Sequence, residues 1–206
     1  MSKTLAWGFD RLAPFYDSLA RLFIGKGIKQ SQRQFLPKLH NKKKLLILGG
    51  GTGWILPPLF EINSSLEVHY IDVSENMIAR AKRKISSANN IQFIVGTINS
   101  CKEYGFDCVI TNFFLDLFED AELDPVIFQI KQRLLPDALW LVTDFVNQTR
   151  WHAWMLKVMY IFFRISTGLK TTCLPAWNSA LIRAGAIKEN EKYFNRGFIQ
   201  AVIFKV

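Results

Sequence analysis

The sequence has few residues of the kinds that indicate a metal centre, a disulfide framework or a membrane-spanning helix. Its three cysteines, Cys101, Cys108 and Cys173, show no C-x-x-C spacing and stand in apolar surroundings. We therefore expect buried free thiols, no metal site and a reducing, cytoplasmic compartment. No apolar run reaches the roughly 18 residues that a transmembrane helix needs. Asp10 and Asp17 interrupt the apolar N-terminal segment, so we expect no signal peptide.

Charge is distributed unevenly along the 206 residues, whose formal net charge is +9. Residues 1–44 carry a net charge of +8, residues 45–150 carry −5 and residues 151–206 carry +6. This pattern assigns the basic surface to the two flanking segments, whereas nonspecific nucleic-acid binding is typical of a uniformly basic protein. The alternative interpretation is a solvated surface with an excess of lysine.

The hydrophobic pattern alternates between strand-like and helix-like segments. Strands that alternate with helices predict parallel crossovers, hence a doubly wound α/β sheet with helices on both faces. The last two strands are separated by only Asn195, Arg196 and Gly197, so we expect them to be antiparallel neighbours. The expected helices are 8–39, 54–62, 76–87, 122–134 and 176–184, and the expected strands are 45–48, 67–71, 91–95, 106–111, 138–145, 187–194 and 198–205.

A glycine-rich loop follows the first predicted strand, with glycines at Gly49, Gly51 and Gly53. Such a loop lets a ligand lie against bare backbone beside a helix N-terminus. Trp54 and Leu56 replace the third glycine of a dinucleotide fingerprint, and Trp54 also replaces the lysine of a phosphate-binding loop. Nineteen residues past Gly53, Asp72 ends the second strand, where its carboxylate could accept hydrogen bonds from both hydroxyls of a ribose.

Three segments together resemble the class I S-adenosylmethionine-dependent methyltransferases: "LLILGGGTG", "VHYIDVSENMIARAKRK" and "LLPDALWLVTDF". The opening "FDRLAPFYDSLARLF" is similar to the N-terminal helix of the ubiquinone/menaquinone C-methyltransferase-like group. The resemblance implies a seven-stranded, Rossmann-like sheet in the order 3-2-1-4-5-7-6 with the last strand antiparallel. It also implies one domain over 1–206, divided into a basic helical arm (1–44), a cofactor-binding core (45–145) and a substrate-facing insertion with the terminal hairpin (146–206).

The same resemblance implies S-adenosylmethionine as the cofactor and a set of residues that bind it. At Ile47 and Thr97 the family commonly has acidic residues, so we expect adenine recognition to depend more on the Ile98 backbone. Pro57 and Pro58 predict that the following helix begins late or has a distorted first turn. The implied cofactor-binding residues are Gly49, Gly50, Gly51, Thr52, Gly53, Asp72, Val73, Met77, Gly96, Thr97, Ile98, Asn112, Phe113 and Tyr16.

Methyl transfer from a sulfonium requires alignment above all, and a base only where the acceptor must lose a proton. Candidate bases are Asp116, His152 and Tyr16. For each candidate a structural interpretation competes: Asp116 stands in "LDLFED", which is typical of a solvent-facing loop, and His152 stands in an aromatic helix where packed histidines are common.

The segment "RWHAWMLKVMYIFFRISTGLK" is the main indication of the acceptor. It is interpreted as a buried core or homodimer helix, as the wall of a pocket for a small apolar or lipid-like acceptor, or as a surface resting on the inner face of an anionic membrane. Two other functions stay open. RNA methylation is suggested by the basic ends but is disfavoured because no RNA-binding module is found, and a non-catalytic binding protein could retain the fold.

Overall fold

One mixed β-sheet organises the molecule. The structure is a computed structural model and describes residues 8, 10, 13, 27–85 and 90–206. Within these residues the seven strands lie in the order β3-β2-β1-β4-β5-β7-β6, as the family resemblance implied, with β7 antiparallel to both of its neighbours. The strands are β1 (Lys44–Leu48), β2 (Glu67–Asp72), β3 (Ile91–Val95), β4 (Phe106–Asn112), β5 (Leu134–Phe145), β6 (Ile187–Phe194) and β7 (Ile199–Lys205).

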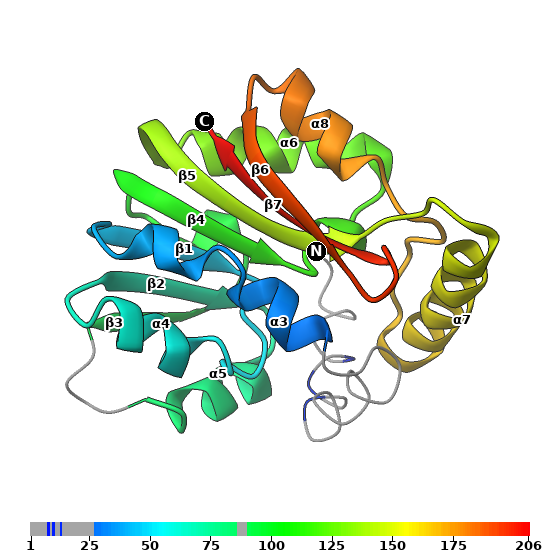
Figure 1. Cartoon of the computed structure of the whole chain (residues 1–206). Coiled ribbons are helices and arrows are strands. Elements are labelled where there is room, and N and C mark those ends of the chain that lie inside the picture. Colours follow the sequence, from blue (N-terminus) through cyan, green and yellow to red (C-terminus); the bar gives the residue numbers. More distant parts are fainter. Residues whose placement is uncertain (1–7, 9, 11–12, 14–26, 86–89) are drawn as a thin grey trace.

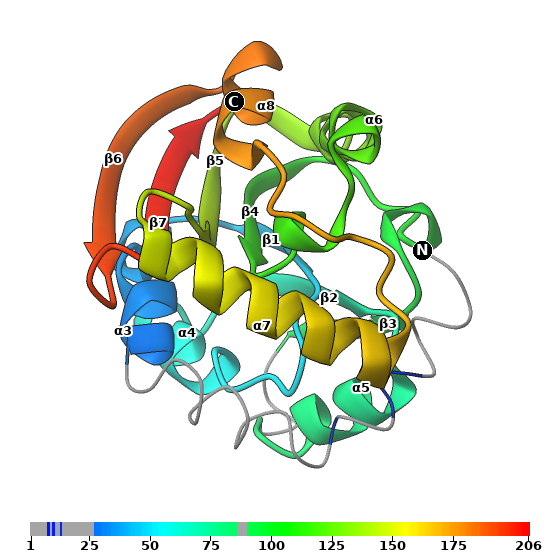
Figure 2. The ribbon, with the colours of Figure 1, turned by 90° about the vertical axis from the view of Figure 1, so that its right-hand side faces the viewer.

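Helices cover both faces of the sheet (Figure 1). One face carries α3 (Gly27–Arg33), the 3₁₀ helix Leu36–Leu39, α4 (Leu56–Ile62) and α5 (Glu75–Lys82), and the other carries α6 (Asp120–Lys131) and α8 (Trp177–Arg183). The helix α7 (Arg150–Thr167) runs across the carboxyl ends of the parallel strands (Figure 2). Short 3₁₀ helices follow β3 (Ile98–Ser100) and β4 (Leu115–Leu117).

Side-chain alternation along β1 divides the core into two layers. Leu45 and Ile47 pack in the cluster beneath α4 and α5, whereas Leu46 and Leu48 pack in the cluster beneath α6 and α8. All four are buried because successive strand residues point to opposite faces and both faces of this sheet are covered. A continuous apolar run therefore forms the strand that leads into the glycine loop.

Several element boundaries differ from those predicted. The helix after the glycine loop begins only at Leu56, and its two prolines occupy the first turn, where backbone N–H groups need no partner within the helix. Strand β5 begins at Leu134 instead of residue 138, and its register against β4 shifts between Phe106 and Cys108. Of the predicted N-terminal helix, the structure describes residues 8, 10 and 13, α3 and the 3₁₀ helix that follows it.

The predicted burial of the thiols is correct for two cysteines and wrong for the third. Cys101 and Cys108 are buried free thiols, whereas Cys173 is exposed. Cys173 lies in the connection between α7 and α8, which runs over the surface and leaves part of its apolar sequence uncovered.

Candidate active site

The loop between β1 and α4 has the conformation that its glycines permit. Gly49, Gly51 and Gly53 adopt positive φ angles of 63°, 63° and 74°, in the region that side-chain-bearing residues rarely occupy. At Gly50 an added Cβ would overlap the ring of Tyr70, whose hydroxyl donates to the Gly51 carbonyl oxygen at 3.0 Å. Tyr70 thus holds the loop against the sheet, and the loop backbone is open to the space beyond the strand ends.

Asp72 holds the loop and the end of β2 together. Its Oδ2 accepts a hydrogen bond from the Gly51 amide at 2.8 Å, and its Oδ1 accepts one from the Ser74 amide at 2.9 Å. Burial, and to a smaller extent the charge of Asp10, raises the pKa of the Asp72 carboxyl, and backbone hydrogen bonds from Ser74, Gly51 and Val73 oppose that rise. Each carboxylate oxygen has a further lone pair, so the side chain can accept ribose hydroxyls without losing these contacts.

The N-terminal arm reaches this site through Asp10. One Asp10 carboxylate oxygen accepts hydrogen bonds from the Ser74 hydroxyl at 2.5 Å and from the Asn76 amide at 3.1 Å. Ser74 in turn caps α5 by accepting from the Met77 amide at 3.1 Å. Asp10 is therefore bound at the N-terminus of α5, where the helix dipole favours a carboxylate.

The residues predicted for the adenine lie along the ends of β2 and β3. Met77 and Ile98 are buried, and Val73 is half-buried. The Gly96 amide donates to the Asp72 carbonyl oxygen at 2.8 Å, which joins the two strand ends. Thr97 donates its own amide to the Ser100 hydroxyl at 3.3 Å at the start of the 3₁₀ helix Ile98–Ser100. The structure thus places the predicted adenine residues after two neighbouring strand ends, with Met77 and Ile98 in different hydrophobic clusters.

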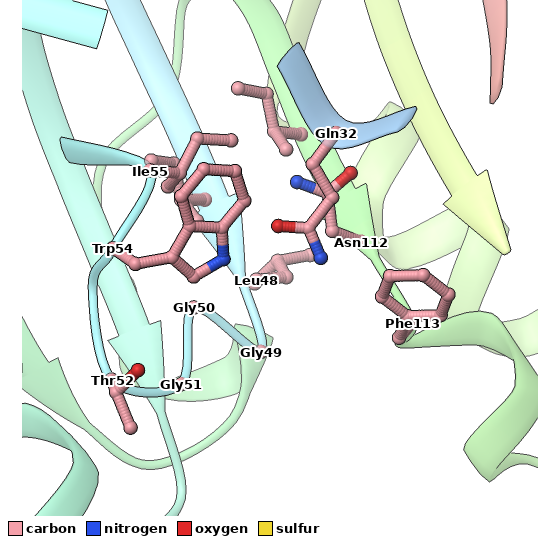
Figure 3. A pocket seen from close by; sticks show the side chains of 12 residues that line it. Gln32, Leu48, Gly49, Gly50, Gly51, Thr52, Trp54, Ile55, Asn112 and Phe113 are labelled. Atoms are coloured by element: carbon pink, nitrogen blue, oxygen red, sulfur yellow. The ribbon is translucent and has the colours of Figure 1, made fainter. Parts of the chain in front are cut away.

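A narrow pocket of about 40 Å³ opens above the glycine loop (Figure 3). The side chains of Gln32 from α3, Trp54 and Asn112 converge over the loop, and Phe113 closes the side next to β4. Cofactor pockets have volumes of roughly 300 to 1,000 Å³, so this cavity is smaller than such a pocket, and Asp72 is not part of its lining. The complete lining is Gln32, Ile47, Leu48, Gly49, Gly50, Gly51, Thr52, Trp54, Ile55, Ile110, Asn112 and Phe113.

Phe113 has a strained backbone at the end of β4. Its φ angle is +51°, and its amide donates to the Thr143 carbonyl oxygen of β5 at 2.7 Å. The ring lies 4.8 Å from that of Phe145, centroid to centroid. Positive φ at a bulky residue is destabilising and is concentrated at functional sites. Here it turns the chain sharply past the pocket and directs the following residues beneath α7.

Asp116 is buried, which corrects the expectation of a solvent-facing loop. The side chain lies in the 3₁₀ helix Leu115–Leu117, and its Oδ1 is a buried atom with no hydrogen-bond partner among the described residues. Tyr160 of α7 donates its hydroxyl to the Asp116 carbonyl oxygen at 3.1 Å. Helix α7 covers this segment, and the sequence pattern of the loop itself contains no signal of that cover.

A second buried carboxylate, Asp144, supports the same segment from β5. Its Oδ2 accepts from the amides of Leu115 and Asp116 at 3.1 Å and 3.2 Å, and its Oδ1 accepts from its neighbour Phe145 at 2.8 Å. Burial raises the pKa of Asp116 to about 7. Burial and then the charge of Asp116 raise the pKa of Asp144 well above its usual value. The pair can therefore hold a proton near neutral pH.

The other two candidate bases differ in position. His152 is buried on α7, with its Nδ1 accepting from the Gln148 amide at 3.1 Å and its Nε2 3.3 Å from the Arg196 carbonyl oxygen. This pairing occupies both nitrogens of a neutral ring and supports the packing interpretation. Tyr16, predicted both to cover the cofactor and as a base, lies outside the described residues.

Sequence reasoning missed several residues of the site. Gln32 and Asp10 come from the arm, and no spacing rule connects them to the glycine loop. Trp54 did give a signal, because it stands where other nucleotide-binding loops have glycine or lysine. Asp144 and Tyr160 are contributed by β5 and α7 and become neighbours of Asp116 only through the packing of α7.

Comparisons with known proteins agree with this geometry. Residues 45–137 match a family model described as a methyltransferase domain. The chain is 28% identical over 136 residues to a carboxy-S-adenosyl-L-methionine synthase of Campylobacter concisus, covering 66% of this chain and 55% of that protein. It is 26% identical over 114 residues to a malonyl-[acyl-carrier protein] O-methyltransferase of Halalkalibacterium halodurans, covering 52% and 41%. The chain thus spans about half the length of the curated relatives it matches.

A solved S-adenosylmethionine-dependent methyltransferase from Aquifex aeolicus has the same fold. The two structures superpose with a TM-score of 0.66 at 16% identity, covering 96% of this chain and 98% of that one. Residues 45–137 are thus similar to methyltransferase domains, and 96% of the chain shares the fold of a solved S-adenosylmethionine-dependent methyltransferase. The resemblance to the quinone C-methyltransferase-like group stays a prediction.

Proposed function

We propose that this protein transfers a methyl group from S-adenosylmethionine to a small, apolar or lipid-like acceptor. The glycine loop and Asp72 fit such a cofactor, because the loop offers bare backbone and the carboxylate has free lone pairs. The loop would hold the amino-acid portion, Asp72 the ribose, and Met77 and Ile98 the adenine. When bound, the cofactor supplies an electrophilic methyl group on a sulfonium sulfur.

The observation that carries the proposal is the apolar inner face of α7. Leu156, Met159 and Tyr160 pack with Phe145 and Phe198 in one cluster that also includes Met77 of the cofactor side. Phe113, at the pocket, is packed against the same cluster. Any acceptor that approaches the pocket past α7 therefore meets aromatic and aliphatic side chains, which favours an apolar molecule.

We assign to Asp116 the removal of a proton from the acceptor. Its carboxyl lies four residues beyond Asn112, at the same edge of the sheet as the pocket, and has a buried oxygen without a partner among the described residues. A carboxyl with a pKa near 7 can take a proton from a hydroxyl or an activated carbon and release it to solvent later. Asp144 and Tyr160 act as positioning residues, because they hold the backbone of Asp116.

A lipid-like acceptor would be met at a membrane, and we propose that the protein associates with the inner face of one from the cytoplasmic side. Among the described residues no helix is long and apolar enough to cross a bilayer. Contact with the membrane would therefore be peripheral.

The proposal is tested in two steps with the full chain. Calorimetry with S-adenosylmethionine and S-adenosylhomocysteine measures cofactor binding, and radiolabelled S-adenosylmethionine measures transfer to quinols, phenols, fatty acids, malonyl-acyl-carrier protein and RNA. Transfer to an apolar acceptor is expected. Absence of binding at millimolar cofactor would refute the assignment, and binding without transfer to any acceptor would favour a non-catalytic protein. Transfer to RNA alone would show that the acceptor is RNA and not an apolar molecule.

A further inference from the structure

Helix α7 has a second apolar face that points away from the protein. Trp151, Trp154, Ile161 and Ile165 are exposed, with 61% of Trp154 and 83% of Ile165 accessible. Trp151 stands at the border of this face, because its ring also lies 5.4 Å from the Phe198 ring, centroid to centroid. They recur every three or four residues, or at multiples of that spacing, so they form one stripe along the helix. Half-buried Val158 completes this outer stripe, which lies opposite the inward residues such as Leu156 and Met159. Scattered exposed apolar residues are common on proteins, but a stripe along an 18-residue helix indicates a binding surface.

A row of cations borders the outer stripe on one side. Arg150, Lys157 and Arg164 recur at seven-residue intervals, which places them in one row along the helix, roughly 10 Å apart. All three are exposed, and α7 contains no acidic residue. No ion pair involving them is found among the described residues. Lys170, also exposed, follows just beyond Gly168, where α7 ends.

The position of α7 leaves its outer stripe accessible at the edge of the molecule where the parallel strands end. The helix is the outermost element over the carboxyl ends of the strands and faces the viewer in Figure 2. Its inner face packs against Phe145 and Phe198. A flat partner lying on the outer stripe would therefore meet the edge of the molecule at which the pocket also opens.

We propose that the outer stripe and its row of cations dock the protein on an anionic phospholipid bilayer, with α7 lying in the plane of the interface. The tryptophan rings suit the depth of the headgroups, the isoleucines reach the acyl boundary, and the cations pair with phosphates. The charge pattern favours this occupant over a protein partner, because every charge on the helix is positive. The inference rests on the proposed function in one respect: a lipid-like acceptor would explain why the protein docks on a bilayer.

The test is flotation of the full chain with vesicles of phosphatidylcholine alone and of phosphatidylcholine mixed with an equal amount of phosphatidylglycerol. Binding to the anionic vesicles is expected, and added salt should weaken it. Removing two cations in Lys157→Gln/Arg164→Gln should weaken binding roughly 30-fold, since each cation near such a surface contributes about a fivefold gain. Trp154→Ser/Ile165→Ser should weaken binding by at least roughly tenfold per side chain.

Two matched controls distinguish binding through the outer stripe and its cations from binding through the overall charge or hydrophobicity of the protein. Lys38→Gln/Lys43→Gln removes two exposed cations near the start of β1, at the opposite edge of the sheet. Phe128→Ser removes an apolar side chain on α6 that is 62% exposed, close to the value for Trp154. Both controls should bind the anionic vesicles as the wild type does. If either weakens binding as much as its α7 counterpart, the assignment to α7 is wrong.

Three other outcomes would also overturn the inference. Equal binding to neutral and anionic vesicles would show that the cations do not contribute to binding. Absence of binding to either kind of vesicle would show that the protein does not dock on a bilayer. Self-association that sedimentation velocity detects without vesicles, and that Trp154→Ser/Ile165→Ser abolishes, would show that a second copy covers the stripe. Calorimetry with S-adenosylhomocysteine on the same samples distinguishes these failures from failure of the proposed function, because cofactor binding does not involve the outer face of α7.

Discussion

Replacing Asp72 by asparagine tests whether this carboxylate holds the ribose. Asp72 accepts from the Gly51 and Ser74 amides at 2.8 Å and 2.9 Å, one on each oxygen. Asparagine keeps one oxygen and turns an N–H₂ group toward the other amide, so one of the two hydrogen bonds is lost. Hydrogen bonds to a charged group contribute about 1.5 to 3 kcal/mol. Part of the lost stability is regained, because burial already disfavours the charged form of Asp72 and raises its pKa.

Asp107→Asn is a matched control at the amino end of β4. Asp107 also accepts from two backbone amides, Lys43 at 2.8 Å and Lys44 at 3.0 Å, and it lies at the opposite edge of the sheet from the glycine loop. Both substitutions should lower the free energy of unfolding by a similar amount, about 1 to 3 kcal/mol. Only Asp72→Asn should weaken binding of S-adenosylhomocysteine, by roughly 10- to 150-fold if one charge-assisted ribose contact is lost.

The measurement is isothermal titration calorimetry of S-adenosylhomocysteine with the wild type and both variants, beside urea unfolding of each. If Asp72→Asn binds the ligand as tightly as Asp107→Asn does, the carboxylate does not contact the ribose. If both variants lose affinity in proportion to their loss of stability, the effect on binding comes from the fold and the reasoning about the site fails.

Three further predictions follow from the site. Gly50→Ala should lower the free energy of unfolding more than Gly51→Ala in urea unfolding, since a Cβ at Gly50 overlaps the Tyr70 ring whereas one at Gly51 meets no protein atom and adds only the strain of its positive φ, roughly 1 to 2 kcal/mol; the reverse order would contradict the loop geometry. Asp116 holds its proton more tightly in the folded than in the unfolded chain, so its contribution to stability is full below about pH 4 and is lost as the pH rises through about 7, by at most about 4 kcal/mol. Asp116→Asn should make this slope shallower in unfolding experiments across that range, while the part due to buried Asp144 remains, and should slow methyl transfer about a hundredfold; an unchanged slope would refute the assignment. Tyr160→Phe removes the hydroxyl that donates to the Asp116 carbonyl oxygen at 3.1 Å, which should lower the free energy of unfolding by about 1 kcal/mol and shift the pH profile of transfer; a lower stability with an unchanged pH profile would leave Tyr160 a purely structural role.

The order of elements and the glycine loop were predictable because their signals are local. An apolar run such as Leu45 to Leu48 that ends in glycines indicates a buried strand followed by a tight turn, and this signal does not depend on the rest of the chain. Asp72 was found because a fixed number of residues separates the ends of the first two parallel strands in such a unit. The prolines correctly indicated the late start of α4 because they act on their own turn.

Burial of polar side chains was not predictable, because it depends on which element covers them. The sequence around Asp116 is polar and typical of an exposed loop, yet α7, more than thirty residues later in the chain, encloses it. The approach of Gln32 to the glycine loop and the contact of Asp10 with α5 likewise join residues that lie far apart in the sequence.

The sequence by itself thus determined the class of sheet, the nucleotide-type loop and the acidic residue beside it, because period, spacing and glycine conformation are short-range properties. Only the tertiary structure decided which apolar residues of α7 face the site and which face outward, since a helix that is apolar nearly all around has no preferred buried side until it packs. The same packing turned Asp116 from a surface residue into a buried carboxyl that can hold a proton near neutral pH.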